Sequence, residues 1–226
     1  MRMLMTTPTF HEIKLIWRPQ PHTERLVVGT LTQEQMDYAF AYDGPDLARA
    51  QQMGFDGYPG LPVSGGPFHG QAMAAFDARN PSPARSDYER LLNAWAIPLD
   101  ADPFTILGLT GGRLPTDLFE FIPNIQPSPG TEFISNLAGV QHYAEAESFR
   151  RMQPGHRLDL VPDPSNTYDP DAIKVMVGDN LVAYVKKGHS TAIASALRAG
   201  EPVECTLDRA SINGVIREVL VRVRFM

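Results

Sequence analysis

An aromatic ring beside a carboxylate is the part of this sequence with the clearest chemistry. Tyr168 and Asp169 stand in the run Asn-Thr-Tyr-Asp-Pro-Asp, and Lys186, Lys187 and His189 follow later in the chain. Stacking of such a ring on a nucleobase contributes ~1–3 kcal/mol per base, and nearby cations follow the phosphate backbone. This combination is typical of a site for the end of a single nucleic-acid strand. The alternative is a tight turn in which Asx side chains cap the backbone and the lysines form a solvated edge.

The same region has acids that suggest a second alternative, a metal-dependent nuclease. The residues concerned are Asp163, Asp169, Asp171 and Lys174. A nuclease core of this kind has one residue between its last acid and its lysine, whereas Asp171 and Lys174 have two residues, Ala172 and Ile173, between them. This spacing makes a nuclease the less favoured interpretation.

Signatures of other enzymes are missing from the sequence. It contains no HExxH or GxSxG motif, its six histidines never fall at i, i+4, and the glycines at 108–112 are not followed by Lys-Ser/Thr. We therefore expect no catalytic residue, no metal site, no cofactor and no enzymatic activity.

Length and composition limit the class of protein. The 226 residues are enough for one large domain or two small ones, at ~150 residues per domain. No apolar run approaches the ~18 residues of a membrane span, and the N-terminal residues lack the apolar stretch of a secretory signal. The single cysteine, Cys205, cannot form an internal disulfide. These features predict a cytoplasmic protein with no membrane contact.

Charge is distributed unevenly along the chain. The formal net charge is −6; residues 1–140 hold 9 Lys and Arg against 15 Asp and Glu, and residues 141–226 hold 11 against 11. All the excess acid therefore lies in the first part. The neutral second part remains suited to nucleic acid, because a local basic face is what attracts phosphates.

Glycine and proline divide the chain into two predicted domains. The run PNIQPSPG predicts a linker at 123–131. Before it, a small α+β domain over 10–122 is expected. Its predicted elements are a hairpin of 27–31 with 38–42, and helices at 68–78, at 86–97 with a Ser86/Glu89 capping box, and at 103–109 with Asp102 as N-cap.

The second domain, 132–226, is rich in predicted strands. These are 157–161, 172–177, 181–185, 203–207 and 219–225, with turns at Gly178-Asp179-Asn180 and Asn213-Gly214. One clear helix, STAIASALRAG, has Ser190 or Thr191 as its expected N-cap. Short strands with one or two helices predict a small, partly closed barrel or sandwich, so the fold class overall is α+β.

Two segments of this domain carry a family resemblance. The run DPSNTYDPDAIKVMVGDNLVAYVKKGHSTAIASAL at 163–197, with GVQHY at 139–143, resembles the HIRAN domain over roughly 132–226. HIRAN domains are DNA-binding modules with a modified OB-like β-barrel. The resemblance implies a pocket that takes the 3′ end of a single DNA strand.

The resemblance also implies roles for particular residues. Tyr168 would stack on the terminal base, Asp169 would accept the 3′-hydroxyl, and Asn166 would shape the pocket. Lys187, with Lys186 beside it, would meet a phosphate. The family's Gly-x-Arg-Tyr element reads Gly139-Val140-Gln141-His142 here, and a neutral Gln141 cannot neutralise a phosphate as arginine would. Gln141 and His142 complete the predicted DNA-binding set.

The first domain has a looser resemblance. The order VVGTL, YAFAYD, GPF, DPFTILGLTGG over about 25–122 is similar to the first N-terminal subdomain of HipA-type Ser/Thr kinases. A free copy of that subdomain implies an antitoxin or regulator that binds such a kinase. The candidate contact residues are Phe55, Tyr58 and Phe68 in the Gly/Pro loop at 54–70. The alternative is that all three rings fold inward and pin the loop.

The sequence thus predicts a non-enzymatic DNA-binding protein that regulates a HipA-type kinase. A stand-alone factor that recognises DNA ends in repair is the main alternative, ahead of the nuclease.

Overall fold

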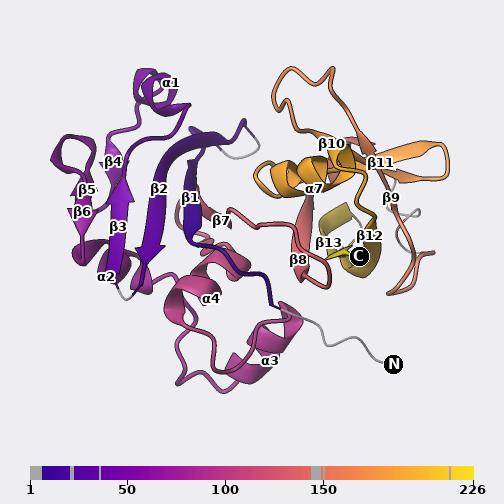
Figure 1. Cartoon of the computed structure of the whole chain (residues 1–226), viewed down its shortest axis with the longest axis horizontal. Helices are drawn as coiled ribbons and strands as arrows, with labels where there is room; N and C mark the ends of the chain where they lie inside the picture. The colour runs from indigo at the N-terminus through magenta and orange to yellow at the C-terminus, as the bar shows by residue number, and fades with distance from the viewer. Residues whose placement is uncertain (1–6, 21–22, 36, 144–148, 150, 214) are drawn as a thin grey trace. The chain divides into compact units, whose positions relative to one another are not determined.

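The chain folds into two units, each with its own hydrophobic core. The computed structural model describes residues 7–20, 23–35, 37–143, 149, 151–213 and 215–226 (Figure 1). One unit is Thr9–Asn124 and the other is built on Ile125–Met226. Both combine sheet and helix, so the predicted α+β class is confirmed.

A five-stranded antiparallel sheet forms the N-terminal unit, in the order β6-β3-β2-β1-β7. Its strands are β1 (Glu12–Trp17), β2 (Leu26–Glu34), β3 (Asp37–Ala41), β6 (Phe68–His69) and β7 (Phe119–Pro123). The predicted hairpin is confirmed as β2 with β3, in which Leu31 pairs with Phe40. The sequence analysis did not include β1 and β7, although β1 lies between β2 and β7.

Short helices and turns complete this unit. They are α1 (Leu47–Gln52), β4 (Gly57–Tyr58), β5 (Leu61–Pro62), η1 (Val63–Gly65), α2 (Gln71–Asp77), α3 (Tyr88–Ala94) and α4 (Pro103–Thr110). The N-cap of α4 is confirmed, because the Asp102 carboxylate accepts hydrogen bonds from the amides of Phe104 and Thr105. Gly111 then ends α4 in the left-handed conformation, with φ 78°.

The predicted capping box of α3 is wrong. The N-cap of this helix is Asp87, which makes no capping hydrogen bond with its side chain. Its carboxylate instead accepts two hydrogen bonds from Arg85, so the local ion pair displaces the cap.

The aromatic loop does not present its rings as predicted. Phe55 and Tyr58 are only 4% and 7% exposed, and both belong to the core of the N-terminal unit. Phe68 is half-buried and packs on Phe40. The expectation that Phe55, Tyr58 and Phe68 form an exposed partner surface is therefore wrong, since apolar burial favours the inward alternative. The rings pin the loop to the sheet.

A curled six-stranded antiparallel sheet forms the C-terminal unit, in the order β12-β13-β8-β11-β10-β9 (Figure 1). Its elements are β8 (Glu132–Ala138), α5 (Val140–Tyr143), β9 (Asp159–Pro162), β10 (Ile173–Val177), β11 (Asn180–Val185), α7 (His189–Arg198), β12 (Val203–Asn213) and β13 (Val215–Phe225). The sheet curls until Arg157, just before β9, forms a bridge with Thr206 of β12. This near-closure confirms the predicted partly closed barrel.

Two of the expected turns and caps have clear outcomes. Gly178 and Asp179 connect β10 to β11, with Gly178 at φ 56°, as the sequence predicts. The expected N-cap of α7 is wrong, because the helix begins at His189 after Gly188. In the Asn213-Gly214 turn, Gly214 lies outside the described residues, while β12 and β13 pair on either side of it.

No helix in the described residues is both long and apolar enough to cross a membrane.

Asp102 provides a direct test of this local account. Asp102→Ala should lower the free energy of unfolding by ~1 kcal/mol, because the amides of Phe104 and Thr105 lose their acceptor. Asp100→Ala is the matched control, since Asp100 is an exposed acid just before the helix. Urea unfolding of the two variants measures the difference. Equal stabilities would contradict the capping role.

Candidate nucleic-acid interface

The connection between β9 and β10 presents an exposed tyrosine on an ordered turn. The Asn166 side-chain oxygen accepts hydrogen bonds from the amides of Tyr168, at 3.0 Å, and Asp169, at 3.2 Å. This is the Asx capping that the turn interpretation predicts. The same turn leaves the Tyr168 side chain 75% exposed. The same turn is therefore capped by Asn166 and holds the Tyr168 ring in solvent.

Asp169 ties this turn to the start of α7. Its Oδ1 accepts the amide of Asp171 at 3.0 Å, and its Oδ2 accepts the Ser190 hydroxyl at 2.8 Å. Each carboxylate oxygen has two lone pairs, so these two bonds leave acceptor capacity on both oxygens. Ser190 is fully buried, which fixes the position of the carboxylate.

Asp163 holds the base of the turn. Its carboxylate accepts hydrogen bonds from the Ser165 hydroxyl at 2.7 Å and the Tyr184 hydroxyl at 2.9 Å, and it pairs with Lys174 at 3.2 Å. Its amide donates to the Ala172 carbonyl across the turn at 2.8 Å. The hydrogen bond from Ser165, followed by that from Tyr184, lowers the pKa of Asp163 to about 2.

Two further rings lie near this base, and the sequence analysis gave neither of them a role. Tyr143, the last residue of α5, is 49% exposed, and its ring lies 5.5 Å from that of Tyr184. Burial, and then the hydrogen bond to Asp163, raise the pKa of Tyr184 to about 12. The alternation in β11 held a signal for Tyr184: Ala183 and Val185 are buried, so Tyr184 points to the other face of the strand.

The predicted basic residues differ in accessibility. Lys187 is half-buried just beyond β11, and Gln141 and His142 are exposed on α5. Lys186 is only 6% exposed, and its carbonyl accepts the amides of His189 and Ser190. Its expected phosphate contact is therefore corrected: the side chain is buried, and its backbone caps the helix.

His189 is buried as well. Its Nδ1 lies 2.8 Å from the Ser135 hydroxyl, and its ring packs against Phe133. These contacts place His189, the first residue of α7, inside the domain.

The acids of the nuclease alternative are engaged separately. Asp163 pairs with Lys174, and Asp171 accepts a hydrogen bond from Arg198 at 2.8 Å. Asp169 bonds Ser190. Across the described part of the chain, no three His, Cys, Asp or Glu residues are grouped so that they could hold a metal ion.

Comparison with known families identifies a part of this unit. The family model of the HIRAN domain matches residues 131–207. These residues form a HIRAN domain. The match covers β8 to β11, α7 and the turn described above, and it ends within β12. It does not extend to the N-terminal unit, whose resemblance to a kinase subdomain stays a prediction. No curated protein matches the chain.

Two solved structures show similarity over part of the chain. The HIRAN domain of human HLTF is 22% identical; the match covers 42% of this chain and 74% of that one, with a TM-score of 0.35. A structural genomics target from Lactobacillus plantarum is 14% identical, over 40% of this chain and 91% of that one, with a TM-score of 0.32.

The pKa of Asp163 predicts how acid affects the fold. Because its value of about 2 lies below the ordinary 3.8, the carboxylate stabilises the folded chain above about pH 4, and this contribution is lost as the pH falls towards about 2. The free energy of unfolding of Asp163→Asn should therefore change less with pH over that range than that of the natural chain. Urea unfolding at a series of pH values measures it.

The control is Asp159→Asn, which alters an exposed acid on β9. It should keep the steep pH dependence. Parallel curves for the natural chain and Asp163→Asn would show that Asp163 does not hold the turn.

Proposed function

We propose that this protein is a non-enzymatic DNA-binding protein whose HIRAN domain holds the 3′ end of a single strand. The observation that carries the proposal is the Tyr168 ring, which is largely exposed on a turn fixed by Asn166. Burial usually removes large apolar surfaces from water, so a fixed and exposed ring is a notable feature. Such a ring suits base stacking at little cost in ordering.

The position of Asp169 supports an end rather than the middle of a strand. A 3′-hydroxyl is a hydrogen-bond donor, and the Asp169 carboxylate has lone pairs left after its bonds to Asp171 and Ser190. An internal nucleotide has a phosphodiester at that position, which has no proton to donate and repels the carboxylate. Lys187 lies just after β11, and the exposed His142 lies on α5. From these positions both side chains can approach the backbone phosphates of a bound strand.

A free 3′-hydroxyl should be required for full affinity. The full chain should bind a short single strand with a 3′-hydroxyl more tightly than the same strand with a 3′-phosphate, because Asp169 repels the added charge. Fluorescence anisotropy at one salt concentration measures both. A strand with a 5′-phosphate is the charge-matched control and should bind like the unmodified strand. Equal affinity for the 3′-hydroxyl and 3′-phosphate strands would contradict end recognition.

The Tyr168 ring should supply stacking energy. Tyr168→Ala should lose ~1–3 kcal/mol of binding free energy, measured with the same strand. As the control, Leu99→Ala removes another exposed apolar side chain, which belongs to the other unit, and this variant should bind DNA normally. Because Tyr168 is exposed, the variant should unfold like the natural chain. Unchanged DNA affinity in a folded Tyr168→Ala protein would leave the turn with a structural role alone.

A kinase-regulating role for the N-terminal unit stays a prediction from resemblance. The surface first expected to carry it is buried at Phe55 and Tyr58. Co-expression of the full chain with a HipA-type kinase and co-purification would test it.

A further inference from the structure

An arginine at the end of α7 pairs with the turn that presents Tyr168. Arg198 Nη1 donates a hydrogen bond to Asp171 Oδ1 at 2.8 Å. The Arg198 side chain is 62% exposed, and that of Asp171 is 21% exposed. The sequence analysis gave Arg198 no role. The fold therefore places an exposed cation beside the candidate DNA site.

Helix α7 contacts this turn near both of its ends. Near its start, the Ser190 hydroxyl donates to the Asp169 carboxylate, and its last residue, Arg198, donates to that of Asp171. The Asp171 amide in turn donates to Asp169 Oδ1 at 3.0 Å. Asp171 thus contacts both the carboxylate proposed for the 3′-hydroxyl and the guanidinium of Arg198.

The three acids of the turn are not equivalent. Asp163 and Asp171 each pair with a cation, at 3.2 and 2.8 Å. Among the described residues, Asp169 accepts hydrogen bonds from neutral donors alone, an amide and a hydroxyl. A carboxylate without a cation repels a DNA strand, whereas a paired one repels it less. Arg198 therefore reduces the repulsion that this turn exerts on phosphates.

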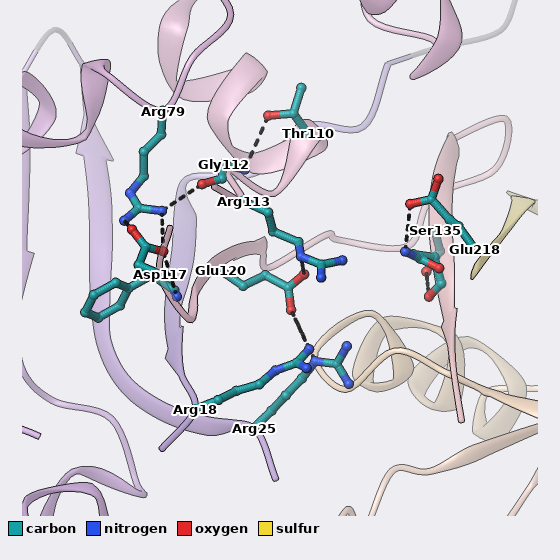
Figure 2. Close-up of polar contacts among 12 residues, drawn as sticks. Arg18, Arg25, Arg79, Thr110, Gly112, Arg113, Asp117, Glu120, Ser135 and Glu218 are labelled. Carbon is teal, nitrogen blue, oxygen red and sulfur yellow. Dashed lines mark hydrogen bonds and ion pairs between the residues drawn. The ribbon is translucent and has the colours of Figure 1, made fainter. Parts of the chain in front are cut away.

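Arg79 shows how an arginine with a purely structural role differs from Arg198. The Arg79 guanidinium is 2% exposed; it donates to the Gly112 carbonyl, pairs with Asp117 (Figure 2) and donates to the Tyr58 hydroxyl. Arg198 is largely exposed and, within the described ranges, makes one hydrogen bond with its five N–H donors. Its other N–H groups can donate to a ligand.

The ion pair of Arg198 with Asp171 does not by itself account for the arginine. Exposed ion pairs contribute little to stability, because water solvates both groups well. A cation in the last turn of a helix also interacts favourably with the helix dipole, and this is the purely structural alternative. A guanidinium can donate to a carboxylate and to a phosphate oxygen at the same time, so the pair need not break when DNA binds.

We infer that Arg198 binds a backbone phosphate of the strand whose 3′ end lies at Asp169. The terminal nucleotide ends in a hydroxyl, so this phosphate belongs to a linkage on its 5′ side. Asp171 holds the guanidinium beside the strand in advance, which lowers the cost of ordering it. The inference rests on the proposed function and adds to it a phosphodiester contact on the α7 side of the turn.

Two substitutions should change the affinity for a 3′-hydroxyl strand in opposite directions. Arg198→Gln should weaken binding about fivefold at ~0.1 M salt and lower the slope of log affinity against log salt by about 0.7, the contribution of one phosphate contact in a single strand. Asp171→Asn removes a competing carboxylate and should strengthen binding. Fluorescence anisotropy of the full chain over a series of salt concentrations measures both variants.

Arg90→Gln is the control for the loss of charge. Arg90 is an exposed arginine of the other unit that also pairs with an aspartate, Asp87. This variant should bind like the natural chain, with the same salt slope. Because the Arg198 side chain is exposed, Arg198→Gln should fold normally, which circular dichroism checks.

Strands with one neutral methylphosphonate linkage locate the contact. At one linkage the neutral group should weaken binding of the natural chain about fivefold and leave Arg198→Gln unaffected, since that variant has already lost the contact. At every other linkage the two proteins should lose the same affinity. This pattern separates a phosphate contact from a role in holding the turn.

The possible failures can be told apart. If Arg198→Gln matches Arg90→Gln while Tyr168→Ala binds weakly, the phosphate contact is overturned and the proposed function stands. If Arg198→Gln and Asp171→Asn weaken binding equally and no linkage distinguishes Arg198→Gln from the natural chain, Arg198 only holds the turn and the inference is overturned. If the natural chain does not bind the 3′-hydroxyl strand, the proposed function itself fails.

Discussion

The carboxylate of Asp163 is the constraint on which the HIRAN site depends. It accepts hydrogen bonds from Ser165 and Tyr184 and pairs with Lys174, so it joins the turn to β10 and β11 at one point. The Asp163 amide also closes the turn by bonding the Ala172 carbonyl. With the base closed in this way, the residues between can form a rigid loop. The low pKa of Asp163 reflects the strength of these contacts.

The rest of the site follows from this closure. Asn166 fixes the backbone of Tyr168 and Asp169, and Ser190 holds the Asp169 carboxylate from α7. A side chain held on both sides loses little freedom when a ligand binds. The domain thus combines an exposed ring with a positioned acceptor, and the proposed recognition of a strand end depends on this pairing.

One ion pair of the N-terminal unit is built into its core. In the N-terminal unit, Arg79 bonds Tyr58, Gly112 and Asp117, so its guanidinium is satisfied and serves the core. Arg79 therefore ties the loop between Gly112 and Asp117 to the core of that unit.

Sequence was most informative where a local rule decides the structure. The Asp102 cap of α4 and the Gly178-Asp179 turn depend on residues close in the chain, and both predictions are confirmed. The strand β8 gave no clear pattern, because its polar Ser135 is buried against His189, a partner far along the chain. Ser190 was expected to cap α7, yet it bonds Asp169.

Exposure was the property that sequence predicted least well. The sequence predicts an exposed Lys186, and this residue is buried. The sequence also predicts a partner-binding surface on the loop at 54–70, but Phe55 and Tyr58 of this loop are buried in the core. In each case tertiary packing decides, and no short-range pattern reports it. For Tyr168 the turn signal was sufficient, because a capped turn at the end of a strand leaves its side chains in solvent.

The most direct test of the account is an NMR titration of the full chain with a short single strand that ends in a 3′-hydroxyl. Amide resonances of Tyr168, Asp169 and Ser190 should shift together and saturate at the same DNA concentration, because these residues form one hydrogen-bonded unit. If these amides stay unmoved while others shift, DNA binds elsewhere and the central claim is contradicted.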